Sequence, residues 1–153
     1  MTKDVPLGEI ILRKYEKPYQ LESRELVKKI CLSLGLLQPG DGRDVVVDIL
    51  LVLVQARNEG KALSSEEIRK KAEKIRKEHS QEVKGLAESN VRRQLGRLRE
   101  LMLVERTRNE YHLTEFRHLD DLFHEKIERF LIPQTVERVK EYLFLFFCHI
   151  TLL

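Results

Sequence analysis

Four arginines between residues 86 and 102 could bind anions. They lie off an apolar seam whose members recur at helical spacing and therefore share one face of a helix. The seam consists of Val91, Leu95, Leu98 and Met102, and the arginines are Arg92, Arg93, Arg97 and Arg99. A guanidinium group can donate two parallel hydrogen bonds to a phosphate or to the edge of a guanine. The segment predicts a helix that packs on a core with one face and presents arginines to water or to an anion.

A short β-hairpin is predicted directly after this helix. Residues 103–106 (LVER) and 111–113 (YHL) have strand composition, and residues 107–110 (TRNE) form the turn between them. Arg106 and Arg108 place positive charge near its tip. An α-helix fits the major groove of DNA, and a basic hairpin beside it can contact the backbone. The two elements together indicate a surface for gripping a duplex.

Positive charge is concentrated in the same part of the chain. Residues 61–108 carry 14 Lys and Arg against 8 Asp and Glu, a net charge of +6, whereas the whole chain of 153 residues carries only +3. A local excess of this kind is typical of nucleic-acid binding. The plainer interpretation is that every exposed helix in a protein rich in Lys and Glu is charged. We favour that interpretation for the outer lysines of the preceding segment, Lys70, Lys71, Lys74 and Lys77.

Composition argues against several other classes of protein. Cys31 and Cys148 are too few for a disulfide framework or a thiolate metal site, which favours a cytoplasmic protein. The five histidines show no zinc-binding spacing, and no nucleophile stands at a readable spacing from a histidine and an acid. We therefore expect no metal, no cofactor and no enzymatic activity. The wealth of Lys and Glu is also compatible with a thermophile.

The segments ahead of the basic helix predict the elements that must position it. Residues 22–37 predict an amphipathic helix, and residues 38–42 (QPGDG) predict a loop. Asp44 is a candidate N-cap for residues 45–57. The run VVVDILLVLV there also has strand composition, but its length and its end signals favour a helix buried on nearly every side. Residues 64–67 (SSEE) predict a capping box that opens the next helix.

Two further helices are predicted after the hairpin. Thr114 can cap a helix over residues 116–130, and Pro133 suits the first turn of a final helix. The end of that helix, residues 142–153 (YLFLFFCHITLL), is apolar on every side. It is too short to span a bilayer. We expect either the domain core or a second subunit to cover it.

The order of elements over residues 43–116 resembles the winged helix-turn-helix superfamily, particularly prokaryotic regulators related to the multiple-antibiotic-resistance repressors. The most specific part is NVRRQLGRL (residues 90–98) followed by LMLVER (residues 101–106). The resemblance implies a mainly α fold with a small β-hairpin wing and additional N- and C-terminal helices. Its recognition helix would span about residues 87–102 and its wing residues 103–113. Met102 stands where that superfamily has a glycine at the end of the recognition helix.

By position, the resemblance implies a set of DNA-facing residues. They are Ser89, Asn90, Arg92, Arg93 and Arg97 on the helix, with Arg106 and Arg108 on the wing. It also divides the chain into an N-terminal arm and helix (1–42), a winged helix-turn-helix domain (43–116) and a C-terminal helical dimerisation arm (117–153).

The function expected from these features is transcriptional regulation through double-stranded DNA, by a homodimer formed through its terminal helices. Three alternatives stay open. The arginines could form a solvated face paired with Glu88 and Glu100 at helical spacing. Asn90 could read adenine or simply occupy the first turn of the helix. A winged helix can also bind protein in place of DNA, whereas no motif supports a small effector.

Overall fold

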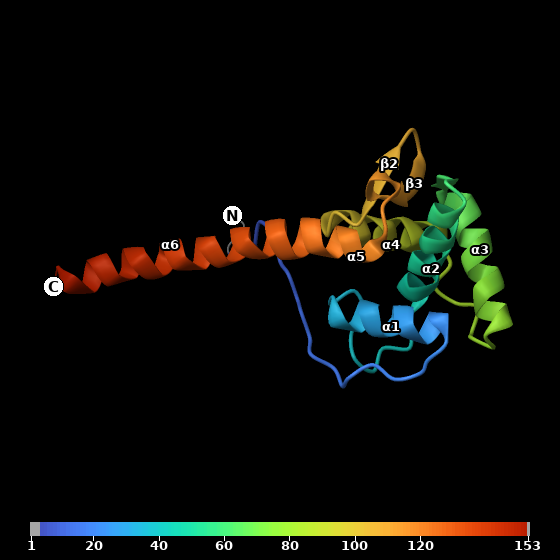
Figure 1. Ribbon diagram of the computed structural model, residues 1–153, viewed down its shortest axis with the longest axis horizontal. Helices are drawn as coiled ribbons and strands as arrows, with labels where there is room; N and C mark the ends of the chain where they lie inside the picture. The colour runs from blue at the N-terminus through green and yellow to red at the C-terminus, as the bar shows by residue number, and fades with distance from the viewer. Residues whose placement is uncertain (1–3, 153) are drawn as a thin grey trace.

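The structure is a computed structural model that describes residues 4–152. It is mainly α-helical with a small antiparallel sheet, as the sequence predicts (Figure 1). The helices are α1 (Ser23–Ser33), α2 (Val45–Asn58), α3 (Ser65–Glu78), α4 (Glu88–Glu100), α5 (Leu119–Leu122) and α6 (Ile132–Thr151). The short helix η1 (Thr114–Phe116) and the π-helix η2 (Phe123–Leu131) join them. The strands are β1 (Leu63–Ser64), β2 (Val104–Thr107) and β3 (Glu110–Leu113).

The predicted hairpin is confirmed and belongs to a three-stranded sheet. The strand order is β1-β3-β2, and both pairings are antiparallel. Leu63 of β1 lies opposite Tyr111 of β3, and both side chains are buried. The sequence did not indicate β1, because a strand of two residues has no alternation to detect. This strand ties the start of α3 to the hairpin.

Helix α2 is the central helix of the fold, which settles the ambiguity between helix and strand in its sequence. Ten of its residues are buried, and it lies between α1, α3, α4 and β3. Its apolar side chains join those of all these elements in one hydrophobic core. Asp44 stands at the N-cap position, but its side chain makes no capping hydrogen bond. The predicted capping role of Asp44 is therefore wrong, because buried arginines take up its carboxylate.

The capping box at the start of α3 is confirmed. The Glu67 amide donates to the Ser64 hydroxyl, and the Ser64 amide donates to Glu67 Oε1, each over 3.2 Å. Ile68 and Ala72 on the inner face of α3 are fully buried against the core. Helix α3 and the following turn lead into α4, which packs against both α2 and α3 (Figure 1).

The N-terminal segment crosses the body as an extended strap, without forming a strand. The Arg13 amide donates to the Ser33 carbonyl over 2.9 Å, and its guanidinium donates to the carbonyls of Leu32 and Leu37. Ile11 packs so closely on Gly35 that a Cβ there would lie 2.5 Å from the Ile11 Cβ. Gly35 also has φ of +71°, so both space and backbone conformation require glycine at this position.

The C-terminal helices form one continuous rod from Leu119 onward, which differs from the predicted pair of helices. Pro133 does lie in the first turn of α6, but Leu131 before it is itself helical, with φ −67° and ψ −42°. Proline in a helix removes one N–H and crowds the carbonyl four residues earlier. Here that carbonyl belongs to the wider π-helical segment η2, whose hydrogen bonds already reach five residues. The helix therefore passes Pro133 without a break.

Thr114 does not cap this rod, so that prediction is also wrong. Its hydroxyl donates to the Met102 carbonyl over 2.8 Å. Glu115 and Phe116 then adopt left-handed conformations, with φ of +55° and +53°, which the Arg57 guanidinium holds by donating to the Phe116 carbonyl. The rod begins only after this sharp turn. Its outer part, α6, projects away from the body (Figure 1).

Candidate functional site

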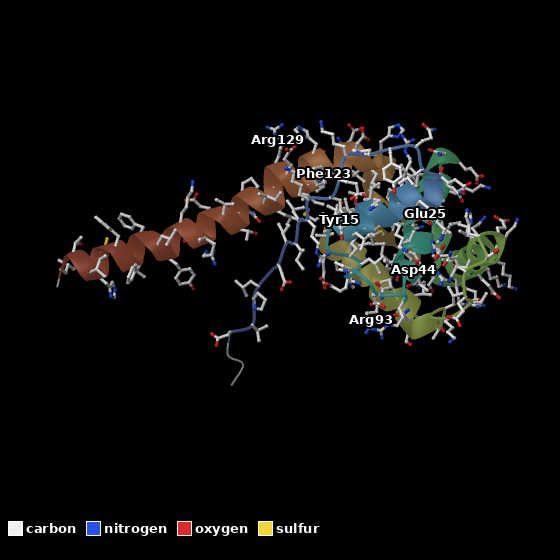
Figure 2. All side chains as sticks on the ribbon, turned by 90° about the horizontal axis from the view of Figure 1, so that it is seen from below. Tyr15, Glu25, Asp44, Arg93, Phe123 and Arg129 are labelled. Atoms are coloured by element: carbon white, nitrogen blue, oxygen red, sulfur yellow. The ribbon has the colours of Figure 1, made fainter. Side chains whose placement is uncertain are left out.

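Helix α4 presents the predicted division between an apolar and a basic face. Val91, Leu95 and Leu98 are fully buried against the core. Ser89, Arg92, Arg93 and Arg99 are exposed on the other side. Arg93 lies at the surface of the body in a side-chain view (Figure 2). Glycine stands at position 96 between these arginines, where an added Cβ would meet no atom within 4 Å. The basic face therefore has a shallow centre flanked by long side chains.

Arg92 and Arg93 are held only by weak contacts within their own helix. Arg92 Nη2 lies 2.7 Å from Glu88 Oε1, and both side chains are more than half exposed. Arg93 Nη2 donates to Asn90 Oδ1 over 3.2 Å. Exposed ion pairs of this kind contribute about 0–1 kcal/mol. Both guanidinium groups can therefore exchange these contacts for a stronger anion at little cost.

Asn90 is half-buried and engaged in local structure. Its Nδ2 donates to the Gly85 carbonyl over 2.6 Å, and its Oδ1 accepts hydrogen bonds from Arg93 and Gln94. These bonds fasten the turn before α4 to the first turn of the helix. Reading a base with Asn90 would require breaking them. The geometry therefore favours a role for Asn90 in holding the start of α4 in place over a role in recognising adenine.

Arg97 ties α4 to the other side of the molecule. Its Nη2 donates to the Gly35 carbonyl and its Nη1 to Gln94 Oε1, each over 3.0 Å. The side chain is half-buried, and its partner carbonyl is 62 residues away in sequence. Arg97 therefore fixes the position of α4 relative to the loop after α1, and less of it is free for a ligand than of Arg92 or Arg93.

The hairpin brings Arg106 and Arg108 together at its tip. Arg108 and Asn109 occupy the two central turn positions with φ of +52° and +65°. Positive φ at both positions matches the twist of two-residue β-hairpin turns. Arg106 donates to Asn109 Oδ1 and lies 5.9 Å from the centre of the Tyr111 ring. Arg106 thus stabilises the turn through Asn109, and Arg108 is exposed in the same turn.

Met102 forms the end of α4 and does not lie on its apolar seam, so that part of the prediction is wrong. It has φ of +62°. The Leu103 amide donates to the Leu98 carbonyl over 3.1 Å, and the Met102 amide donates to the Arg99 carbonyl over 2.9 Å. These bonds form the Schellman motif, in which glycine is the usual residue at this position. The chain therefore makes the turn that the resemblance implies, with methionine in place of glycine.

The structure also brings basic loop residues to the same surface that the sequence did not single out. Arg43 and Lys84 border a hollow of about 520 Å³ together with Asn90, Arg93 and Arg97. They come from loops more than 40 residues apart, so only the fold unites them with α4. Their signal in the sequence is a lone positive charge in a polar loop, which is too common to be informative.

A buried network of four charges positions this surface, and no local pattern in the sequence indicates it. Asp48 accepts hydrogen bonds from Arg24 Nε over 2.9 Å and from Arg76 Nη1 over 2.7 Å. Asp44 accepts from Arg24 Nη2 over 3.2 Å and from Arg76 Nη1 over 2.8 Å. All four side chains are almost completely buried. The network locks α1 and α3 onto α2.

The hydrogen bonds of this network favour the charged form of Asp44 and extend to the turn before α4. Burial works to raise the pKa of Asp44, but hydrogen bonds from Arg76 and Arg24 outweigh it and hold that pKa below its ordinary value. Arg76 Nε also donates to the Glu82 carbonyl over 2.7 Å. The network thereby reaches the turn that leads into α4 and sets where that helix begins.

Over residues 4–152 no group of three His, Cys, Asp or Glu side chains could hold a metal ion. No helix among these residues is both long and apolar enough to cross a membrane.

Comparisons of the chain with protein families, with curated proteins and with solved structures give no match.

Proposed function

We propose that this chain is a winged helix-turn-helix transcriptional regulator that binds double-stranded DNA. Helix α4 would enter the major groove, and the β2–β3 hairpin would contact the neighbouring backbone. The observation that carries the proposal is the pair of exposed, weakly held guanidinium groups of Arg92 and Arg93, on a helix that leads into the basic hairpin tip. Arg92, Arg93 and Arg108 would supply most of the anion contacts.

The other predicted DNA-facing residues take different parts in this proposal. Ser89 is exposed in the first turn of α4, where a hydroxyl can donate to a phosphate. Asn90 and Arg97 hold α4 in place through Gly85 and Gly35. Arg106 stabilises the turn that presents Arg108. Phosphate contacts position the protein on the duplex, and contacts with base edges provide sequence specificity.

The proposed regulator acts as a homodimer through its terminal helices. Two α4 helices related by a two-fold axis can meet successive major grooves when they lie one turn of DNA, about 34 Å, apart. The support for a dimer is the apolar surface of α6, which the rest of the described chain leaves exposed.

The experiment that tests DNA binding compares two double variants with equal loss of charge. Arg92→Ala/Arg93→Ala removes the exposed guanidinium groups of α4, whereas Lys70→Ala/Lys71→Ala removes two exposed charges from α3. Fluorescence anisotropy on a mixed-sequence duplex, titrated with salt, measures binding. The log–log slope should flatten by about 0.9 for each phosphate that the α4 variant no longer neutralises. The α3 variant should keep the slope of the unmodified protein.

A second candidate function is a winged helix that binds another protein. The exposed apolar surface of α6 favours it, because such a surface serves a protein partner as well as a second copy. The same titration separates the two functions. Absence of duplex binding even at low salt contradicts the DNA proposal and leaves protein binding as the better one.

A further inference from the structure

The exposed apolar surface of α6 is large enough to form a subunit interface. Its members are Val136, Val139, Tyr142, Leu143, Phe144, Leu145, Phe146, Phe147, Ile150 and Leu152, and each is 46–86% exposed. An aromatic side chain alone has about 150–250 Å² to bury, so the surface is on the order of 1,000 Å². Typical monomers expose apolar patches of only about 300–600 Å². A standard interface buries about 800 Å² on each partner, which this surface provides.

Part of this surface continues the face with which the rod packs on the body. Phe123, Ile127 and Ile132 contact the core and follow one another at intervals of four and five residues, as the wide turns of η2 allow. After Ile132 the spacing changes to that of an α-helix, and the stripe runs on through Val136, Val139, Leu143, Phe146 and Ile150. One apolar stripe on the rod is therefore buried against the body at its start and exposed to solvent along α6.

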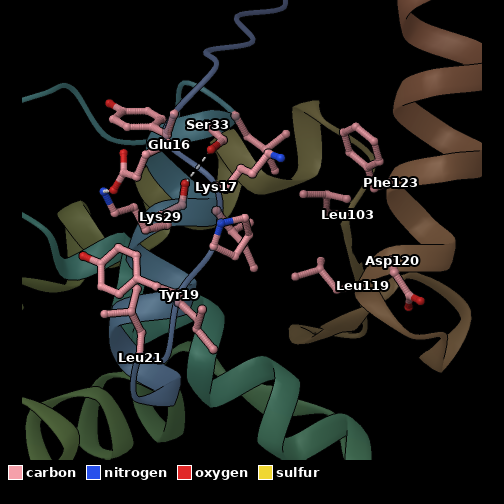
Figure 3. A pocket seen from close by; sticks show the side chains of 15 residues that line it. Glu16, Lys17, Tyr19, Leu21, Lys29, Ser33, Leu103, Leu119, Asp120 and Phe123 are labelled. Carbon is pink, nitrogen blue, oxygen red and sulfur yellow. Dashed lines mark hydrogen bonds and ion pairs between the residues drawn. The ribbon is translucent and has the colours of Figure 1, made fainter.

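A groove at the base of the rod is a second apolar surface that is open to solvent. It has a volume of about 680 Å³ and lies between the N-terminal strap, α1 and the start of the rod (Figure 3). Its walls include Tyr15, Pro18, Leu26, Ile30, Leu103 and Phe123. Tyr15 and Phe123 mark its position where the rod leaves the body (Figure 2).

Three polar residues on the wall of the groove, Glu16, Lys29 and Ser33, are already paired within the chain. Lys29 Nζ lies 2.6 Å from Glu16 Oε1 and 5.0 Å from the centre of the Tyr15 ring. The Ser33 hydroxyl donates to the Lys29 carbonyl over 2.7 Å. A polar ligand that used these three groups would have to break their contacts, and most of the remaining wall is apolar. The groove therefore suits an apolar occupant that is held by its shape and by burial.

We propose that the end of α6, residues 142–152, from a second copy fills this groove, and that the two copies exchange their α6 ends reciprocally. The proposal rests on the dimer of the proposed function but does not depend on DNA binding. A chain cannot fill its own groove with this segment. Phe146 lies roughly 30 Å beyond Phe123 along one continuous helix.

An antiparallel, two-fold arrangement brings each helix end to the partner's groove. When two rods pair in opposite directions, the end of one meets the base of the other, where the groove opens. Pairing of the rods alone would cover the stripe that contains Leu143 and Phe146 but would leave Phe144 and Leu145 exposed, because those two residues point off it. A groove beside the partner's rod would cover these off-stripe side chains, as a helix end that is apolar on every side requires.

The chain contains no tryptophan, so Phe146→Trp gives a single fluorescent reporter in the proposed occupant. We expect blue-shifted emission that is protected from acrylamide, and a dimeric mass by light scattering. Adding Leu26→Glu places a charge in the groove wall and should shift the emission to the red and yield monomers. Val83→Glu is the matched control, because Leu26 and Val83 are similarly exposed, at 40% and 44%, and Val83 lies outside the groove. Circular dichroism confirms that each variant is folded.

Tyr19→Glu, at a second exposed position in the groove, provides an independent test should Leu26→Glu unfold the chain. The proposal is overturned if the reporter stays blue-shifted in both groove variants, since the α6 ends then pair with each other alone. It is also overturned if the Phe146→Trp protein is a monomer with red emission at micromolar concentration. A monomer that still binds DNA through Arg92 and Arg93 would refute this interface and the proposed dimer, and it would leave the proposed DNA binding intact.

Discussion

Replacing Asp48 by asparagine should destabilise the fold strongly. The Asp48 carboxylate accepts three hydrogen bonds from two buried guanidinium groups, from Arg24 over 2.9 and 3.1 Å and from Arg76 over 2.7 Å. Asparagine has nearly the same size but no charge. The two arginines would then share one remaining carboxylate, that of Asp44, in a site almost closed to water.

The magnitude follows from leaving one buried positive charge uncompensated. Breaking a buried ion pair on one side costs about 3–5 kcal/mol. A domain of this size has a total stability of about 5–15 kcal/mol, so the variant should lose a large part of it. The double variant Arg24→Met/Asp48→Leu removes one charge of each sign and fills the space. It should recover much of the loss, because the Arg76–Asp44 pair stays balanced.

Urea unfolding followed by circular dichroism measures these free energies. Glu66→Gln serves as the control, because Glu66 forms an exposed pair with Arg69 over 2.6 Å and its loss should cost less than about 1 kcal/mol. The reasoning is refuted if Asp48→Asn costs no more than this control. It is also refuted if the double variant is less stable than Asp48→Asn, since removing the unpaired charge should restore stability.

Four further outcomes are expected. The pKa of Asp44 is lowered in the folded state, so the contribution of Asp44 to stability is complete above about pH 4. That contribution is lost as the pH falls through the folded-state pKa of Asp44. An unfolding free energy that stays unchanged from pH 5 to pH 2 would contradict this expectation. Burial raises the pKa of the Cys31 thiol to about 12, so a thiol reagent at pH 8 should leave Cys31 unmodified until the protein unfolds, and fast modification of Cys31 in the folded protein would contradict this. Met102→Gly should raise the unfolding free energy by about 1 kcal/mol, because the left-handed conformation no longer strains a side chain; a decrease would mean that Met102 packing outweighs the strain. Gly96→Ala should also raise the unfolding free energy by about 1 kcal/mol, because position 96 is helical and has room for a Cβ. The same variant should weaken DNA binding if α4 approaches the duplex closely at this position. Unchanged affinity in the anisotropy titration would exclude such a close approach.

Features governed by neighbouring residues could be predicted from the sequence. The capping box of α3 depends on Ser64 and Glu67, and the hairpin turn depends on residues 107–110. Each of these patterns contains all the groups that form the structure. The burial of α2 followed from its composition in the same way.

Features that depend on distant partners could not be predicted. Arg24 and Arg76 look like any other charged residue in a chain with 35% charged residues. Their partner Asp48 lies 24 and 28 residues away, and only the packing of α1 and α3 on α2 brings the three together. The continuity of the rod through Pro133 has a similar origin, because it depends on the π-helical turn of the preceding segment. A local rule for proline contains no information about that turn.

Within the candidate site, the roles of single arginines also depend on distant partners that the sequence does not indicate. Arg93 and Arg97 are one helical turn apart and have the same side chain, so sequence reasoning assigns them the same role. The fold separates them, because the Gly35 carbonyl reaches the guanidinium of Arg97 whereas Arg93 contacts only the neighbouring Asn90. A guanidinium committed to the body can affect a ligand by fixing the orientation of its helix, while an exposed one contributes by direct contact. DNA affinity that depends on Arg97 would therefore disappear together with folding stability, and affinity that depends on Arg93 would disappear without it.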